Sequence, residues 1–181
     1  MTWADVMTAV VEDDHLVITI ADAGRRTVRS VAQGLIDCLE DEPPSPWTKV
    51  GRARRRAHER LFPPAYRSRA LSVEFTRRHD ATIRADLAAA AQRLRDGLDG
   101  DGPIRWPLDD TDDWVRVLGT ARFLYVDRQA EPGVSAEEGK ASMVLAFYQS
   151  VVLKALRPDL VEALPPELVP LRRELLREER T

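Results

Sequence analysis

Arginine side chains are the most concentrated chemical feature of this sequence. The stretch GRARRRAHERLFPPAYR, Gly51–Arg67, contains six arginines and no lysine. A guanidinium group can bind carboxylate or phosphate through two parallel hydrogen bonds, so this stretch is suited to contact with an acidic partner. The candidate partner-binding residues are the arginines, with two aromatic side chains as anchors: Arg52, Arg54, Arg55, Arg56, Arg60, Trp47 and Tyr66.

Three explanations of this arginine-rich stretch stay open. The arginines form a solvated helix face neutralised by the acidic segments on either side, or they bind an acidic protein segment, or they contact the phosphate backbone of a nucleic acid. Residue type does not separate the last two, because arginine pairs equally well with carboxylate and phosphate. Few aromatic residues lie nearby, and the whole chain has a net charge of −3. Both observations disfavour the explanation that the arginines bind nucleic acid.

No recognisable set of catalytic or metal-binding residues occurs. The three histidines, His15, His58 and His79, lack metal-binding spacing, and the HExxH, GxGxxG and GxSxG motifs are absent. The segment GVSAEEGKA, residues 133–141, resembles a phosphate-binding loop but has one spacer residue too many. We therefore expect no enzyme activity, no catalytic residues, no bound metal and no cofactor.

Cys38 is the single cysteine of the chain, which excludes an internal disulfide and a multi-cysteine metal site. It falls on the apolar stripe of an expected helix, which predicts a small buried thiol. The alternative is a single-thiol redox sensor. Acidic residues surround Cys38 in sequence and disfavour the thiolate that such a sensor needs.

Charge is distributed unevenly along the chain. Residues 49–79 contain 10 basic and 2 acidic side chains, net +8, between two acidic segments. No apolar run approaches the ~20 residues of a membrane span, and the N-terminus lacks the basic region of a signal peptide. We expect no membrane association and a cytoplasmic location.

The hydrophobic pattern changes from a period of two to a helical period near residue 21. Val6–Ala21 is typical of a β-hairpin, with a polar turn at residues 12–15. The helices expected after it lie at about 22–40, 47–61, 70–79, 80–98, from Asp109 or Asp110 as N-cap to 125, and from the capping box at Ser135 to Leu156. A short extended piece is expected at 104–106.

These elements predict a mainly α fold, a bundle of about five or six helices with a small N-terminal antiparallel β-hairpin. One domain is expected over residues 1–160, and residues 161–181 form a C-terminal tail or helix beyond a proline cluster.

Three segments carry a resemblance to a known family. The chain resembles an uncharacterised actinobacterial family, domain of unknown function 2017, in these segments: FPPAY, Phe62–Tyr66, followed by EFTRRHDATIRADL, then WPLDDTDDWVRVLGTARFLYVDR and MVLAFYQSVVLKAL. The likeness extends over about residues 10–157. The family is encoded beside the Clp-protease adaptor ClpS and is named AosR-like, an oxidative-stress transcriptional regulator.

The resemblance implies a sigma factor or another regulator as partner and a paired-cysteine redox switch. Cys38 has no second cysteine to pair with, so the switch is not expected here. We therefore expect a non-enzymatic regulatory protein that binds a protein partner in transcriptional or stress-response control. A DNA-binding regulator acting through the arginines and an adaptor in Clp-dependent proteolysis stay open as alternatives, as does a homodimer.

Overall fold

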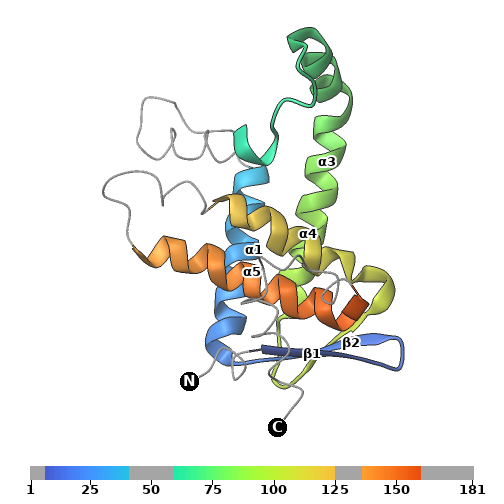
Figure 1. Cartoon of the computed structure of the whole chain (residues 1–181), viewed down its shortest axis with the longest axis vertical. Coiled ribbons are helices and arrows are strands. Elements are labelled where there is room, and N and C mark those ends of the chain that lie inside the picture. Colours follow the sequence, from blue (N-terminus) through green and yellow to red (C-terminus); the bar gives the residue numbers. More distant parts are fainter. Residues whose placement is uncertain (1–6, 41–58, 125–135, 160–181) are drawn as a thin grey trace.

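The structure is a computed structural model that describes residues 7–40, 59–124 and 136–159 of the chain. In this part of the chain α-helices dominate, and a small antiparallel sheet contains the N-terminal hairpin (Figure 1). The predicted mainly helical fold with an N-terminal β-hairpin is thus confirmed. The domain limits 1–160 and 161–181 stay predictions, because residues 160–181 lie outside the described residues.

The hairpin consists of β1 (Met7–Glu12) and β2 (His15–Ile20) in antiparallel pairing. Asp13 and Asp14 connect the strands with positive φ angles of 45° and 60°. A two-residue turn with both φ angles positive matches the right-handed twist of the strands, and aspartate tolerates this conformation better than most residues do. The core side of β2 carries Leu16, Ile18 and Ile20.

A third strand, β3 (Ile104–Pro107), pairs with β2 and gives the strand order β1-β2-β3. Trp106 lies opposite Leu16 and Ile104 lies opposite Ile18, and all four side chains are buried. The sequence predicts this extended piece but not its pairing, because the register between segments so far apart in the chain leaves no local signal.

Helix α1 (Asp22–Glu40) packs antiparallel against the C-terminal half of α3 (Arg69–Gly97). Near the start of α1, Arg25 Nη1 donates to the carbonyl of Leu98 at 3.1 Å. At the other end of α1, Glu40 Oε1 accepts from Gln92 Nε2 at 2.9 Å. The buried side chains of the two helices include Val28, Val31, Ala32, Leu35, Ile36 and Leu39 of α1 and Leu87, Ala88, Ala90, Ala91 and Leu94 of α3.

The sequence-based prediction of two helices meeting at Asp80 is wrong, since α3 continues through this residue. Asp80 Oδ2 lies 2.8 Å from Arg84 Nε, one turn further along the same helix. A pair at this spacing stabilises a helix interior. No proline occurs in α3, and its single glycine is the last residue, so nothing local ends the helix near Asp80.

The connection to α4 (Asp112–Ala121) contains β3 and the short 3-10 helix η2 (Leu108–Asp110). Thr111 occupies the N-cap position of α4, so the prediction that Asp109 or Asp110 caps this helix is wrong. The 3-10 turn contains both of these aspartates and therefore delays the start of α4. The Thr111 hydroxyl donates to the Leu108 carbonyl at 2.7 Å, which fixes the turn.

A buried carboxylate joins α4 to α3. Asp113 is 4% exposed, and it accepts two hydrogen bonds from Arg93, at 2.7 Å from Nε and 2.9 Å from Nη2. These hydrogen bonds raise the pKa of Arg93 above its usual value. Asp113 thus links the start of α4 to α3. As an acidic residue in the first turn of a helix, it also interacts favourably with the helix dipole.

After η3 (Arg122–Leu124), helix α5 (Ala136–Leu156) completes the described fold and packs against α4 and β1. Its end at Leu156 agrees with the sequence prediction, while the predicted capping residue Ser135 lies outside the described residues. The buried side chains of α5 include Leu145, Tyr148, Val151 and Val152.

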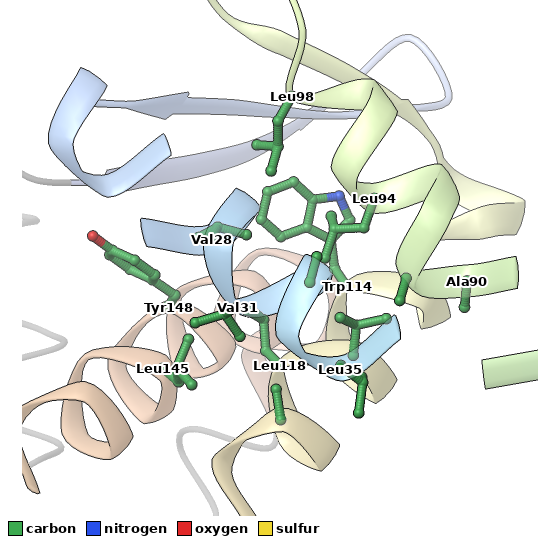
Figure 2. Close-up of a cluster of buried hydrophobic side chains, with 14 of the residues drawn as sticks. Val28, Val31, Leu35, Ala90, Leu94, Leu98, Trp114, Leu118, Leu145 and Tyr148 are labelled. Carbon is green, nitrogen blue, oxygen red and sulfur yellow. The ribbon is translucent and has the colours of Figure 1, made fainter. Parts of the chain in front are cut away.

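Trp114 lies at the centre of the core and is completely buried. Trp106 of β3 meets it edge to face, with ring centroids 6.0 Å apart and an angle of 88° between the ring planes. Figure 2 shows Trp114 among Val28, Val31 and Leu35 of α1, Leu94 and Leu98, Leu118 of α4, and Leu145 and Tyr148 of α5. The Trp114 indole therefore packs against side chains of both the helices and the sheet.

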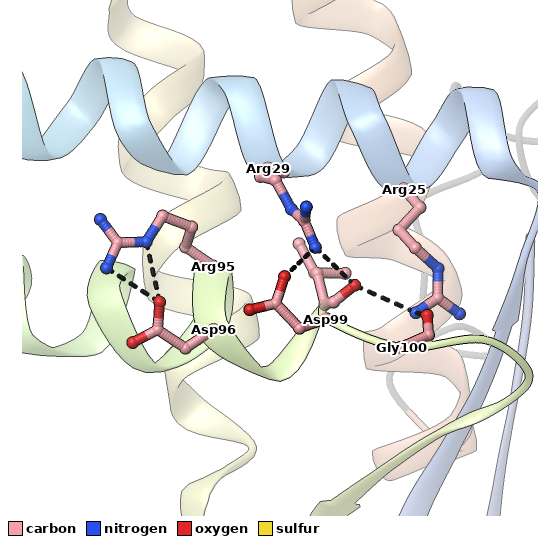
Figure 3. A network of polar contacts seen from close by, with 7 residues as sticks. Arg25, Arg29, Arg95, Asp96, Asp99 and Gly100 are labelled. Carbon is pink, nitrogen blue, oxygen red and sulfur yellow. Dashed lines mark hydrogen bonds and ion pairs between the residues drawn. The ribbon is translucent and has the colours of Figure 1, made fainter.

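Two arginines of α1 bind the segment that follows α3 (Figure 3). Arg25 donates to the Gly100 carbonyl at 2.9 Å, and Arg29 Nη2 donates to the Leu98 carbonyl at 2.9 Å and pairs with Asp99. Carbonyl groups at a helix C-terminus lack intrahelical partners and carry partial negative charge. The two guanidinium groups bind the carbonyl of the C-cap residue Leu98 and that of Gly100 beyond it, and so fix the end of α3 and the following segment to α1.

We expect Gly97→Ala to lower the free energy of unfolding by about 1–3 kcal/mol. A Cβ at this position would lie 2.3 Å from Cζ3 of the buried Trp106 ring, which cannot move without disturbing the sheet. Gly119→Ala is the matched control, since its Cβ would meet the terminal Nε2 of Gln149, at 2.7 Å. That side-chain end can shift at the expense of its hydrogen bond to the Val115 carbonyl, and this loss is offset because alanine is favoured over glycine in a helix by about 1 kcal/mol. Urea unfolding of both variants measures the difference, and equal stabilities would contradict the prediction.

Candidate functional site

The sequence-predicted binding residues fall into two groups. Trp47, Arg52 and Arg54–Arg56 lie outside the residues that the structure describes. Arg60 and Tyr66 are described, and they lie on either side of the Pro63-Pro64 turn. Their role as partner-binding residues stays a prediction.

Arg60 is half-buried, and its Nε donates to the backbone carbonyl of Phe123 at 3.0 Å. This bond ties the residues before the proline turn to η3. Tyr66, by contrast, is 50% exposed. The two residues therefore differ, since Arg60 helps to hold the turn against the body while Tyr66 faces solvent.

Ser72 fixes the backbone of Tyr66 to the first turn of α3. The Ser72 hydroxyl accepts from the Tyr66 amide at 3.0 Å and donates to the Tyr66 carbonyl at 2.7 Å. The Tyr66 ring meets Phe75 edge to face with ring centroids 6.0 Å apart, and Phe75 packs on His79 at 4.8 Å. The FPPAY segment is thus held on one side of α3 by a serine that sequence reasoning did not identify.

The N-terminal part of α3 extends beyond the end of α1. Helix α3 has 29 residues and α1 has 19, and Arg84 Nη1 lies 3.5 Å from the carbonyl of Leu39 at the end of α1. Figure 1 shows this part of α3 projecting from the body of the molecule. We call residues 69–84 the α3 arm. Within the arm Ser72 alone is buried.

Exposed apolar side chains lie along the α3 arm. Leu71 is 56% exposed, Val73 is 60% exposed and Ile83 is 39% exposed. Ile83 lies at helical spacing from Leu87 and Leu94, which are buried, and this apolar pattern predicts that Ile83 is buried as well. It is not, because α1 ends before it can cover this turn of α3.

Basic side chains outnumber acidic ones around the arm. Residues 59–84 contain six arginines and three acidic residues. Glu74 Oε1 lies 2.9 Å from Arg77 and 2.7 Å from Arg78, and the hydrogen bonds from Arg77, then from Arg78, lower the pKa of Glu74. Arg67 and Arg69 are exposed and have no ion-pair partner among the described residues.

An apolar groove lies beside the arm. It has a volume of about 350 Å³ and is bounded by Leu61–Pro63, by the Phe75–Leu87 part of α3, and by Arg116 and Thr120 of α4. The guanidinium group of Arg84 lies over the Phe62 ring, 5.1 Å from its centroid. We call this cavity the arm groove.

A second cavity, of about 520 Å³, lies at the opposite end of α3. Its lining mixes apolar and polar side chains and carries both signs of charge. Arg25 and Arg93, two of its arginines, already bind acceptors within the chain. The larger cavity therefore offers less unpaired charge to a ligand than the arm does.

Within residues 7–40, 59–124 and 136–159, no three histidine, cysteine or acidic side chains group closely enough to hold a metal ion. Cys38 is half-buried on α1, less deeply than its place on the apolar stripe predicts. In the same part of the chain no helix is both long and apolar enough to cross a membrane.

We expect Ser72→Ala to raise the amide hydrogen-exchange rate of Tyr66 by about fivefold, because the amide loses its acceptor and a net hydrogen bond is worth about 1 kcal/mol. Ser150→Ala is the matched control. It removes a hydroxyl that donates to the Ala146 carbonyl within α5 at 2.8 Å. Exchange measured by mass spectrometry on a peptide containing Tyr66 should respond to the first substitution alone. Unchanged exchange in Ser72→Ala would show that the turn is held by other contacts.

Comparison with known proteins identifies one family model, described as a domain of unknown function (DUF2017), which matches residues 7–164. No curated protein and no solved structure matches the chain.

Proposed function

The chain belongs to the DUF2017 family, and from its geometry we propose that it is a non-enzymatic regulatory protein that binds a protein partner through residues 59–84. The observation that carries the proposal is the α3 arm, which extends past the end of α1 with apolar and arginine side chains exposed together.

The mixture of side chains favours protein over nucleic acid as the partner. Protein interfaces combine a central apolar or aromatic contact with arginine, whereas binding to a phosphate backbone depends on charge. Leu71, Val73 and Tyr66 are each at least half exposed, and the neighbouring Arg67 and Arg69 have no ion-pair partner among the described residues. A phosphate polymer would use the two arginines and leave the apolar side chains in water.

The regulatory role comes from the resemblance to AosR-like oxidative-stress regulators, which implies a sigma factor or another transcription regulator as partner. The predicted arginines Arg52 and Arg54–Arg56 come shortly before residues 59–84 in the sequence, and we include them in the proposed binding surface. A disulfide switch is not part of it, since Cys38 is the single cysteine of the chain.

We expect Arg67→Glu with Arg69→Glu to reduce recovery of the partner by about tenfold or more in affinity purification from the native host, read by mass spectrometry. The folded state should be unaffected. No acidic residue lies in the first turn of α3, and carboxylates are favoured at a helix N-terminus. Arg54→Glu with Arg55→Glu should act in the same direction.

The matched control is Arg105→Glu with Arg157→Glu, which removes two half-exposed arginines far from the arm in sequence. Its partner recovery should equal that of the unmodified chain. Equal recovery with the arm variant would contradict the proposal. A mobility shift of random duplex DNA at moderate salt by the unmodified chain, lost in the arm variant, would assign the arginines to nucleic acid instead.

A further inference from the structure

We infer that the arm groove receives the apolar face of an acidic amphipathic helix of the partner protein. The inference rests on the proposed function and adds the chemistry and the shape of what is bound.

The lining of the groove is mainly apolar, and part of it is accessible. Phe62, Phe75, Ile83 and Leu87 contribute to its walls, and Ile83 is 39% exposed. The volume of about 350 Å³ lies near the lower limit of the roughly 300–1,000 Å³ range of small-molecule pockets. Space of this size and lining suits a few aliphatic side chains, whose burial would cover Ile83.

The length and the walls of the groove favour a helix over an extended strand. Its α3 wall runs from Phe75 to Leu87, which corresponds to about 18 Å at a helical rise of 1.5 Å per residue. That span corresponds to about three turns of a helix, and apolar side chains at positions i, i+4 and i+7, which extend over roughly 10.5 Å, fit within it. A helix and a turn form the wall on this side, so it offers no free strand edge for an added β-strand.

Charge at the rim favours an acidic partner. Arg116 of α4 is exposed at the groove and has no ion-pair partner among the residues described, and Arg84 stands over Phe62. Asp80 is the acidic side chain of the lining, and it is paired with Arg84 at 2.8 Å. A helix with glutamates beside its apolar face therefore meets the guanidinium group of Arg116, whereas one with lysines meets like charge.

A synthetic peptide tests this inference directly. The probe is a fluorescein-labelled helix of roughly 18 residues, with leucine at i, i+4 and i+7 and glutamate and alanine elsewhere. In one control peptide lysine replaces glutamate, and in the other serine replaces leucine. Fluorescence anisotropy with the full chain should show binding of the probe at least about tenfold tighter than that of either control.

Substitutions in the chain locate the binding. Ile83→Glu should weaken binding of the probe by about tenfold or more, because it places a carboxylate in the apolar groove facing an acidic helix. Val10→Glu is the matched control, since Val10 is a half-exposed β-branched residue on β1. Arg116→Glu, compared with Arg105→Glu, gives a second test that leaves the apolar walls intact.

Similar affinities of the three peptides, or equal binding by the Ile83→Glu and Val10→Glu variants, would overturn the inference. A dimer in sedimentation that Ile83→Glu converts to monomer would assign the groove to a second copy and would also overturn it. Partner capture that depends on Arg67 and Arg69 but not on Ile83 would leave the proposed function standing and reject the groove.

Discussion

The antiparallel packing of α1 on α3 is the contact on which the rest of the fold depends. It places the start of α1 at the end of α3, where Arg25 and Arg29 bind the carbonyls after the helix. Ala88, Ala90 and Ala91 are buried on α3 and add little side-chain volume to the core. Because α1 is ten residues shorter, its last turn meets α3 near Arg84, and the remaining turns of α3 extend beyond it.

Local signals in the sequence predict much of the fold. Alternation in β2, the aspartates of the hairpin turn and the apolar stripe of α1 each depend on residues a few positions apart. The continuity of α3 and the pairing of β3 with β2 depend on other information. An aspartate such as Asp80 can start a helix or pair one turn along within one, and a single sequence does not separate these outcomes.

The candidate site is predicted only in part. The sequence identifies Tyr66 and the basic character of the region, because aromatic and arginine residues are visible without a fold. It misses Ser72, Ile83 and Arg116. Ile83 lies on an apolar stripe that predicts burial, and its exposure follows from where a different helix ends. The contribution of Arg116 depends on α4 lying beside α3, which is a tertiary contact.

The continuity of α3 has a mechanical consequence. Its backbone hydrogen bonds run without a proline from Arg69 to Gly97, about 43 Å at 1.5 Å per residue. Gly97 packs directly beneath the Trp106 ring, and that ring touches Trp114. A force applied to the outer turns of α3 would thus be transmitted along a continuous helix to the centre of the molecule, because no proline or glycine before Gly97 provides a point of bending.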